Sequence, residues 1–112
     1  MIIIENASGN IFEAWKVTMG DLPPFLQTIL DRNDLIVSGP LDYKRIKPIP
    51  FLDDSSNTKI GIRHLNPQGY VSWDFASAGD IIVNKTHQYT DRADVEVLSP
   101  NKFNQRFKIY KH

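Results

Sequence analysis

Histidine is the residue type in this chain with the broadest chemical range, and it occurs three times, as His64, His87 and His112. A zinc site built from histidines uses short paired spacings, such as i and i+4 on a helix or i and i+2 on a strand. No two of the three have such a spacing, and the chain contains no cysteine that could add a thiolate ligand or form a disulfide. The sequence therefore predicts no metal site.

Asp80 is the carboxylate with the most suggestive neighbours, since it follows a glycine and precedes three apolar residues. The interpretation that we favour is a turn in which its carboxylate caps backbone amides. The alternative places Asp80 in a cleft with Arg63, His87 and Tyr89, where it could bind a ligand or support acid–base catalysis. Serine nucleophile elbows, phosphate-binding glycine loops and dinucleotide fingerprints are missing from the sequence. We therefore expect a non-enzymatic role and no bound cofactor.

The segment 85–92 is rich in side chains that donate and accept hydrogen bonds, among them His87, Tyr89 and Arg92. Loops mounted on a sheet commonly carry recognition. Together with Trp73, these residues could line a site for a ligand or a protein partner. The alternative is a solvated hairpin loop, which is the more common role of such a segment.

The C-terminal segment 101–112 contains basic residues and no acidic one. The basic residues that could contact nucleic acid are Lys102, Arg106, Lys108 and Lys111. They are interleaved with Phe103, Phe107 and Tyr110, and this mixture of cations and stacking rings suits single-stranded nucleic acid. In the alternative, the rings face the core and the cations are solvated. The whole chain has 13 basic and 13 acidic residues, so we do not expect nucleic acid to be its main partner.

These candidates must be positioned by a single domain, residues 1–112, because a chain of this length has room for one core. The run Gly20-Asp21-Leu22-Pro23-Pro24 predicts a helix over about 22–32, with Asp21 as its cap and prolines in its first turn. Ser99-Pro100 predicts a short C-terminal helix or turn that places Phe103 and Phe107 on one face. Apolar alternation predicts strands over 11–19, 35–37, 58–64, 70–75, 81–83 and 95–98.

Mixed helices and strands joined by short turns predict an α+β fold with a mostly antiparallel sheet of about five or six strands. Residues 11–19 also fit a helical face, but the β-branched pair Val17-Thr18 favours a strand. The turn Asn66-Pro67-Gln68-Gly69 predicts a hairpin between the strands on either side. Residues 39–57 contain three prolines and are expected to form a long irregular connection, which is either a functional loop or contains a short strand around 46–51.

Several sequence features occur together and in a fixed order. They are Ala14-Trp15-Lys16-Val17, Gly20-Asp21-Leu22-Pro23, Phe25-Leu26, Ala78-Gly79-Asp80-Ile81-Ile82-Val83, Pro100, Phe103 and Tyr110. In this the chain resembles a family of small phage and prophage proteins named for a Pro-Gly-Asp-Tyr-Gly motif. It departs from the family at Ala78, where the family has proline, at Ile81, where it has an aromatic residue, and at 85–89, which replace a glycine-glutamate-aromatic stretch. The resemblance implies a phage or mobile-element origin and, because the family is uncharacterised, no particular function.

The sequence as a whole predicts a small accessory protein that acts by binding another protein. Binding of a small molecule or nucleotide in a loop-built cleft, and binding of nucleic acid through the C-terminus, are the alternatives. The chain shows no signal-peptide pattern and no apolar run as long as a membrane span, so we expect a cytoplasmic location and no membrane contact. Exposed edge strands and aromatic residues would also allow self-association, which the sequence leaves open.

Overall fold

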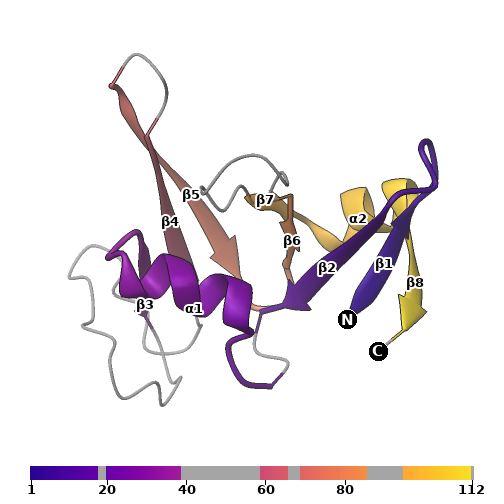
Figure 1. The fold of residues 1–112 in the computed structure, drawn as a ribbon, viewed down its shortest axis with the longest axis horizontal. Helices are drawn as coiled ribbons and strands as arrows, with labels where there is room; N and C mark the ends of the chain where they lie inside the picture. The colour runs from indigo at the N-terminus through magenta and orange to yellow at the C-terminus, as the bar shows by residue number, and fades with distance from the viewer. Residues whose placement is uncertain (18–19, 39–58, 66–68, 86–94, 112) are drawn as a thin grey trace.

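The protein was analysed as a computed structural model, which describes residues 1–17, 20–38, 59–65, 69–85 and 95–111. These residues form two antiparallel sheets and two helices (Figure 1). The strands are β1 (Ile2–Glu5), β2 (Ile11–Lys16), β3 (Leu35–Ser38), β4 (Lys59–Leu65), β5 (Val71–Ser77), β6 (Ile81–Asn84), β7 (Val95–Leu98) and β8 (Phe107–Lys111). The helices are α1 (Pro24–Asp31) and α2 (Pro100–Arg106). The predicted α+β class with mostly antiparallel sheet is confirmed.

The strands are divided between two sheets rather than joined in one. Five strands form a sheet in the order β7-β6-β2-β1-β8, and three form a second sheet in the order β3-β4-β5. The described residues thus contain eight strands, more than the five or six expected. The two additional strands are β1 and β8, which pair with each other at one end of the larger sheet.

The strand β8 was not predicted, because the aromatic residues at its start have a spacing that also fits a helix. Phe103 and Phe107 are four residues apart, which suggested one helical face, but α2 ends at Arg106 and Phe107 begins β8. The two rings still stack, with centroids 5.6 Å apart and planes 15° apart. The side chain of Ser99 accepts a hydrogen bond from the backbone N–H of Lys102 and so caps α2, as its sequence suggests.

The helix α1 begins two residues later than predicted, and its cap differs from the prediction. The N-cap residue is Pro23 and makes no side-chain hydrogen bond, so Asp21 does not cap the helix. The carbonyl of Pro23 accepts hydrogen bonds from the N–H groups of Leu26 and Gln27. Pro24 occupies the first turn of the helix, where a backbone N–H group would have no partner within the helix. Because proline has no N–H group, fewer donors remain for a capping carboxylate to satisfy.

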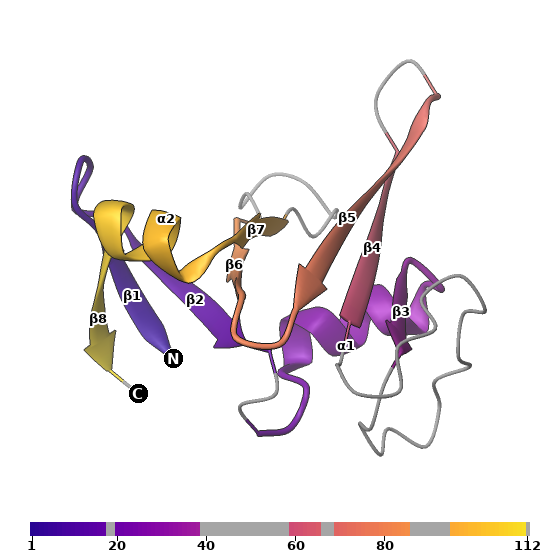
Figure 2. The ribbon, with the colours of Figure 1, turned by 180° about the vertical axis from the view of Figure 1, so that it is seen from behind.

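Two hydrophobic cores lie on opposite faces of the five-stranded sheet. The first core joins this sheet to α1 and to one face of the three-stranded sheet, and it consists of Trp15, Val17, Phe25, Leu26, Ile29, Leu35, Ile60, Ile62, Ala76, Ile82 and Val95. The second core lies beneath α2 and consists of Ile3, Ala14, Ile81, Val83, Leu98, Phe103 and Phe107. Figures 1 and 2 show α1 and α2 on opposite sides of the molecule. The strand β6 and the end of β2 are therefore buried on both faces.

The turn between β5 and β6 carries the chain from the smaller sheet to the larger one. Gly79 has a φ of +92°, which a glycine adopts without strain. Its N–H donates to the carbonyl of Val17, and the N–H of Val17 donates to the carbonyl of Asp80. These backbone hydrogen bonds attach the turn to the end of β2. Neither of the described helices is long and apolar enough to span a membrane.

Candidate protein-binding surface

The three-stranded sheet buries one face and exposes the other, which we call the outer face. The register places Leu35 across from Ile62, and Ile60 across from Ala76, on the buried side. The next row, on the outer face, contains Ile36, Gly61 and Phe75. The next row on the same face pairs Arg63 with Trp73, and Val71 lies beyond Trp73 on β5. Figure 2 shows this sheet with α1 behind it, and neither described helix lies over the outer face.

Large apolar side chains of β5 are exposed on the outer face. The exposed fractions are 37% for Trp73, 48% for Phe75 and 54% for Val71, and Tyr70, immediately before the strand, is 72% exposed. The rings of Trp73 and Phe75 stack, with planes 11° apart and centroids separated by 6.3 Å. Single exposed apolar residues are common on proteins, but a contiguous apolar group on a regular strand is typical of an interaction site.

The absence of a side chain at Gly61 lets the apolar surface extend across the sheet. A Cβ atom at this position would lie 3.1 Å from a ring carbon of Phe75 and 3.2 Å from a side-chain carbon of Ile36. Both neighbours therefore lean over the backbone of β4. The apolar surface reaches from β3 to β5 without interruption.

A charged group borders this apolar surface. The guanidinium of Arg63 donates hydrogen bonds to Oδ1 of Asp34 from Nε at 2.9 Å and from Nη2 at 2.6 Å. The Nε atom of Arg32 lies 3.4 Å from Oδ2 of the same carboxylate. Two guanidinium groups thus share one carboxylate. The side chains of Arg63 and Arg32 remain 44% and 36% exposed.

Asp80 caps the turn that contains it, which is the interpretation favoured from the sequence. Its Oδ2 accepts a hydrogen bond from the N–H of Ser77 at 2.9 Å, and its own N–H donates to the carbonyl of Ser77 at 3.0 Å. Ser77 pairs with Lys59 and Trp73 pairs with Arg63, so about 13 Å of strand separates Arg63 from this turn. The structure does not bring Arg63 and Asp80 together. His87, Tyr89 and Arg92 lie outside the described residues, as does the connection 39–57.

His64 and Asp74 form a contact that sequence reasoning missed. Nε2 of His64 lies 3.0 Å from Oδ2 of Asp74, without the alignment of a hydrogen bond, so their attraction is electrostatic and depends on protonation of the histidine. The alternation in each strand was visible in the sequence, but the pairing of these two residues depends on the register of the hairpin. Among the described residues, no group of three His, Asp or Glu side chains is placed to hold a metal ion.

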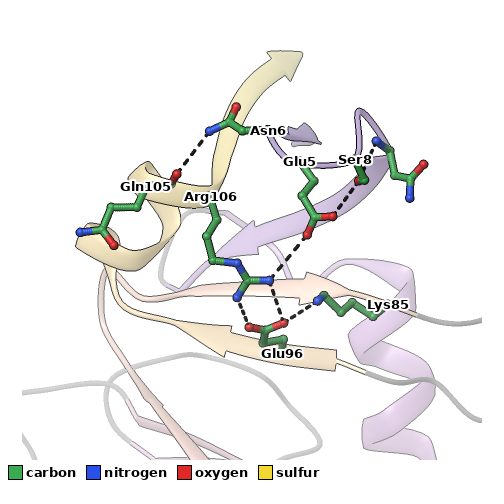
Figure 3. A network of polar contacts seen from close by, with 8 residues as sticks. Glu5, Asn6, Ser8, Lys85, Glu96, Gln105 and Arg106 are labelled. Carbon is green, nitrogen blue, oxygen red and sulfur yellow. Dashed lines mark hydrogen bonds and ion pairs between the residues drawn. The ribbon is translucent and has the colours of Figure 1, made fainter.

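Arg106, one of the candidate nucleic-acid contacts, is engaged within the protein (Figure 3). Its guanidinium forms a two-pronged ion pair with Glu96 of β7, and its Nη2 atom also lies 3.6 Å from Oε2 of Glu5. Nζ of Lys85 lies 2.6 Å from Oε2 of Glu96. The hydrogen bond from Arg106 lowers the pKa of Glu96 below its ordinary value, and the same bond raises the pKa of Arg106. This network fastens the end of α2 to the larger sheet.

The other three basic candidates are exposed but distributed over two elements. Lys102 lies on α2, whereas Lys108 and Lys111 lie on β8. Of the rings interleaved with them, Phe103 and Phe107 are buried in the second core, and Tyr110 is 65% exposed. The aromatic residues of this segment thus mainly serve the core, and Tyr110 is the exception.

The site residues named from the sequence included Trp73 but omitted Phe75, Val71 and Tyr70. The signal was present, because Val71, Trp73 and Phe75 alternate along one strand face. That pattern normally marks the buried face of a strand, whereas the structure buries Ala76 on the opposite face. Comparisons of the chain with models of known families, with curated proteins and with solved structures find no match, so its own geometry carries the functional argument.

Proposed function

We propose that this protein is a non-enzymatic binding module whose outer face, centred on Trp73 and Phe75, docks onto another protein. The observation that carries the proposal is the exposed, stacked pair of rings on a regular strand. Tryptophan, tyrosine, phenylalanine and arginine are enriched at protein interfaces, and the few residues that dominate the binding energy are most often tryptophan, tyrosine or arginine. Because the rings stand on a sheet, they are held in place before binding, which reduces the entropic cost of association.

The described residues give less support to the alternatives. A loop-built cleft for a small molecule would use Arg63 and Asp80, but about 13 Å of strand separates Arg63 from the turn that Asp80 caps. Nucleic-acid binding through the C-terminus would use Arg106, which is held by two carboxylates of the protein itself. Action in the cytoplasm is part of our proposal, and the phage or mobile-element origin stays a prediction from the resemblance alone.

The proposal is tested by removing the apolar groups from the outer face without touching the cores. The variant is Trp73→Ser combined with Phe75→Thr, and the matched control is Ile11→Ser combined with Tyr110→Ser, which alters two side chains that are 60% and 65% exposed. Affinity capture with quantitative mass spectrometry should recover the same partner with the original protein and the control. We expect recovery with the outer-face variant to fall at least about tenfold, as for loss of central aromatic contacts. Equal recovery with all three proteins would refute the proposal.

A further inference from the structure

We infer that the partner segment covering the outer face is both apolar and acidic. It would place aliphatic or aromatic side chains on Trp73 and Phe75 and an aspartate or glutamate beside Arg63. This inference rests on the proposed function and specifies its partner. It follows from the kinds of charge that border the apolar surface.

The charged side chains that the described strands place on the outer face are both basic. The register puts Lys59 and Arg63 on this side, in line with Gly61 between them. Asp34, just before β3, supplies one carboxylate, which Arg63 and Arg32 share. Among the described ion pairs, two guanidinium groups thus face one carboxylate, and Arg63 brings this excess of positive charge next to Trp73. This excess is local, because the whole chain has equal numbers of basic and acidic residues.

Because of the position of Arg63, a partner that binds the apolar surface also contacts a positive charge. Arg63 and Trp73 are directly opposite one another on neighbouring strands, a position in which side chains are close enough to contact the same ligand. A partner that covers the indole removes water from the neighbouring guanidinium. A carboxylate next to its apolar residues would then compensate the charge, and the planar guanidinium suits such a group.

A second copy of this chain fits the outer face less well. Packing two outer faces together would bring two copies of Arg63 into one interface, and like charges placed together oppose association. Single-stranded nucleic acid would find stacking rings, but the chain has 13 basic and 13 acidic residues, so it lacks the net positive charge that attracts a phosphate backbone. An acidic, apolar protein segment satisfies both the rings and the excess charge.

The experiment selects peptides from a phage-displayed library of random linear sequences. Selection is performed on the original protein, on the variant Arg32→Gln with Arg63→Gln, and on the control Lys108→Gln with Lys111→Gln, which removes two exposed cations from β8. We expect the original protein and the control to enrich peptides that combine apolar residues with Asp or Glu. The arginine variant should keep the apolar preference and lose the acidic one.

A selected peptide then provides the quantitative test by calorimetry. Replacing its acidic residue with the amide should weaken binding to the original protein about two- to fivefold, the effect of an exposed ion pair. The same replacement should have no further effect on the arginine variant, because the two changes remove one interaction. Added salt should lower the affinity of the original protein for the acidic peptide and leave its affinity for the amide analogue unchanged. This comparison requires no protein variant.

Four other results would refute either this inference or the proposed function. Apolar peptides without acidic enrichment would refute this inference and leave the proposed function intact. Peptides whose binding survives Trp73→Ser with Phe75→Thr would refute the proposed function itself. Concentration-dependent self-association that this variant abolishes would identify a second copy as the occupant. Binding of a fluorescent oligothymidine that the variant abolishes would identify nucleic acid instead.

Discussion

The two sheets of this protein differ in how many of their faces are buried. The five-stranded sheet has α1 and the smaller sheet on one side and α2 on the other, so its central strands contribute to two cores. The three-stranded sheet has a core on one side, and its outer face shows exposed aromatic residues. Most apolar residues in the larger sheet are thus explained by folding, although its Ile11, Ile109 and Tyr110 are exposed. Those of the outer face are not explained by folding, and this difference is the main reason to assign them to binding.

The largest effect that tests this comparison comes from truncating one phenylalanine packed against each sheet, Phe103 of α2 and Phe75 of β5. Phe103 is buried between α2 and the larger sheet, so Phe103→Ala should reduce the free energy of unfolding by about 3–5 kcal/mol. Phe75 is 48% exposed, and Phe75→Ala should reduce it by less than about 1 kcal/mol. Urea denaturation measures both values. Similar losses would show that Phe75 serves the fold, and the comparison would then fail.

A smaller effect is expected at the turn that connects the sheets. Asp80→Ala removes the carboxylate that accepts the N–H of Ser77, and we expect a loss of about 1 kcal/mol in the free energy of unfolding. Partner recovery in affinity capture should not change, because the turn is not part of the outer face. Lost recovery with undiminished stability would instead favour a binding role for Asp80.

The smallest effect concerns the network that fastens α2 over the larger sheet. Because Arg106 lowers the pKa of Glu96 in the folded protein, ionised Glu96 stabilises the fold above the ordinary glutamate range, and this contribution is lost as the pH falls through the lowered pKa. Glu96→Gln should therefore cost less than about 1 kcal/mol at neutral pH. It should also flatten the decline of stability in acid, measured by urea denaturation across a pH series. Glu13→Gln, at an exposed position of β2, serves as the control. A decline as steep as in the original protein would rule out this role for Glu96.

Much of the fold could be predicted because local patterns agree with the final structure. The prolines before α1 and the Ser99-Pro100 start of α2 are local signals, and both helices form at those places. The strand over 81–83 was also predictable, because a short apolar run after a Gly-Asp turn fits a strand buried on both faces. The strand β1 gave a weaker signal, since its four residues become a strand only through pairing with β2 and β8.

The sequence shows that Val71, Trp73 and Phe75 share one strand face but not whether that face is exposed, because this depends on one residue of register. A β-turn over 66–69 would pair Leu65 with Tyr70 and turn Trp73 and Phe75 toward the same side as Ile60 and Ile62. The structure pairs Leu65 with Val71 instead. A shift of one residue exchanges the two faces of a strand, and here it places the aromatic residues of β5 outside. Alternation alone cannot distinguish these registers.

One of the chain's two tryptophans lies in a core and the other lies on the outer face. Trp15 is 5% exposed within the first core, and Trp73 is 37% exposed on the outer face. Indole fluorescence shifts to shorter wavelength in apolar surroundings, and soluble quenchers reach only accessible rings. Emission from Trp15 therefore reports unfolding, whereas quencher protection of Trp73 reports occupation of the outer face. The molecule thus carries a separate intrinsic optical probe for each event, and docking can be followed without a label.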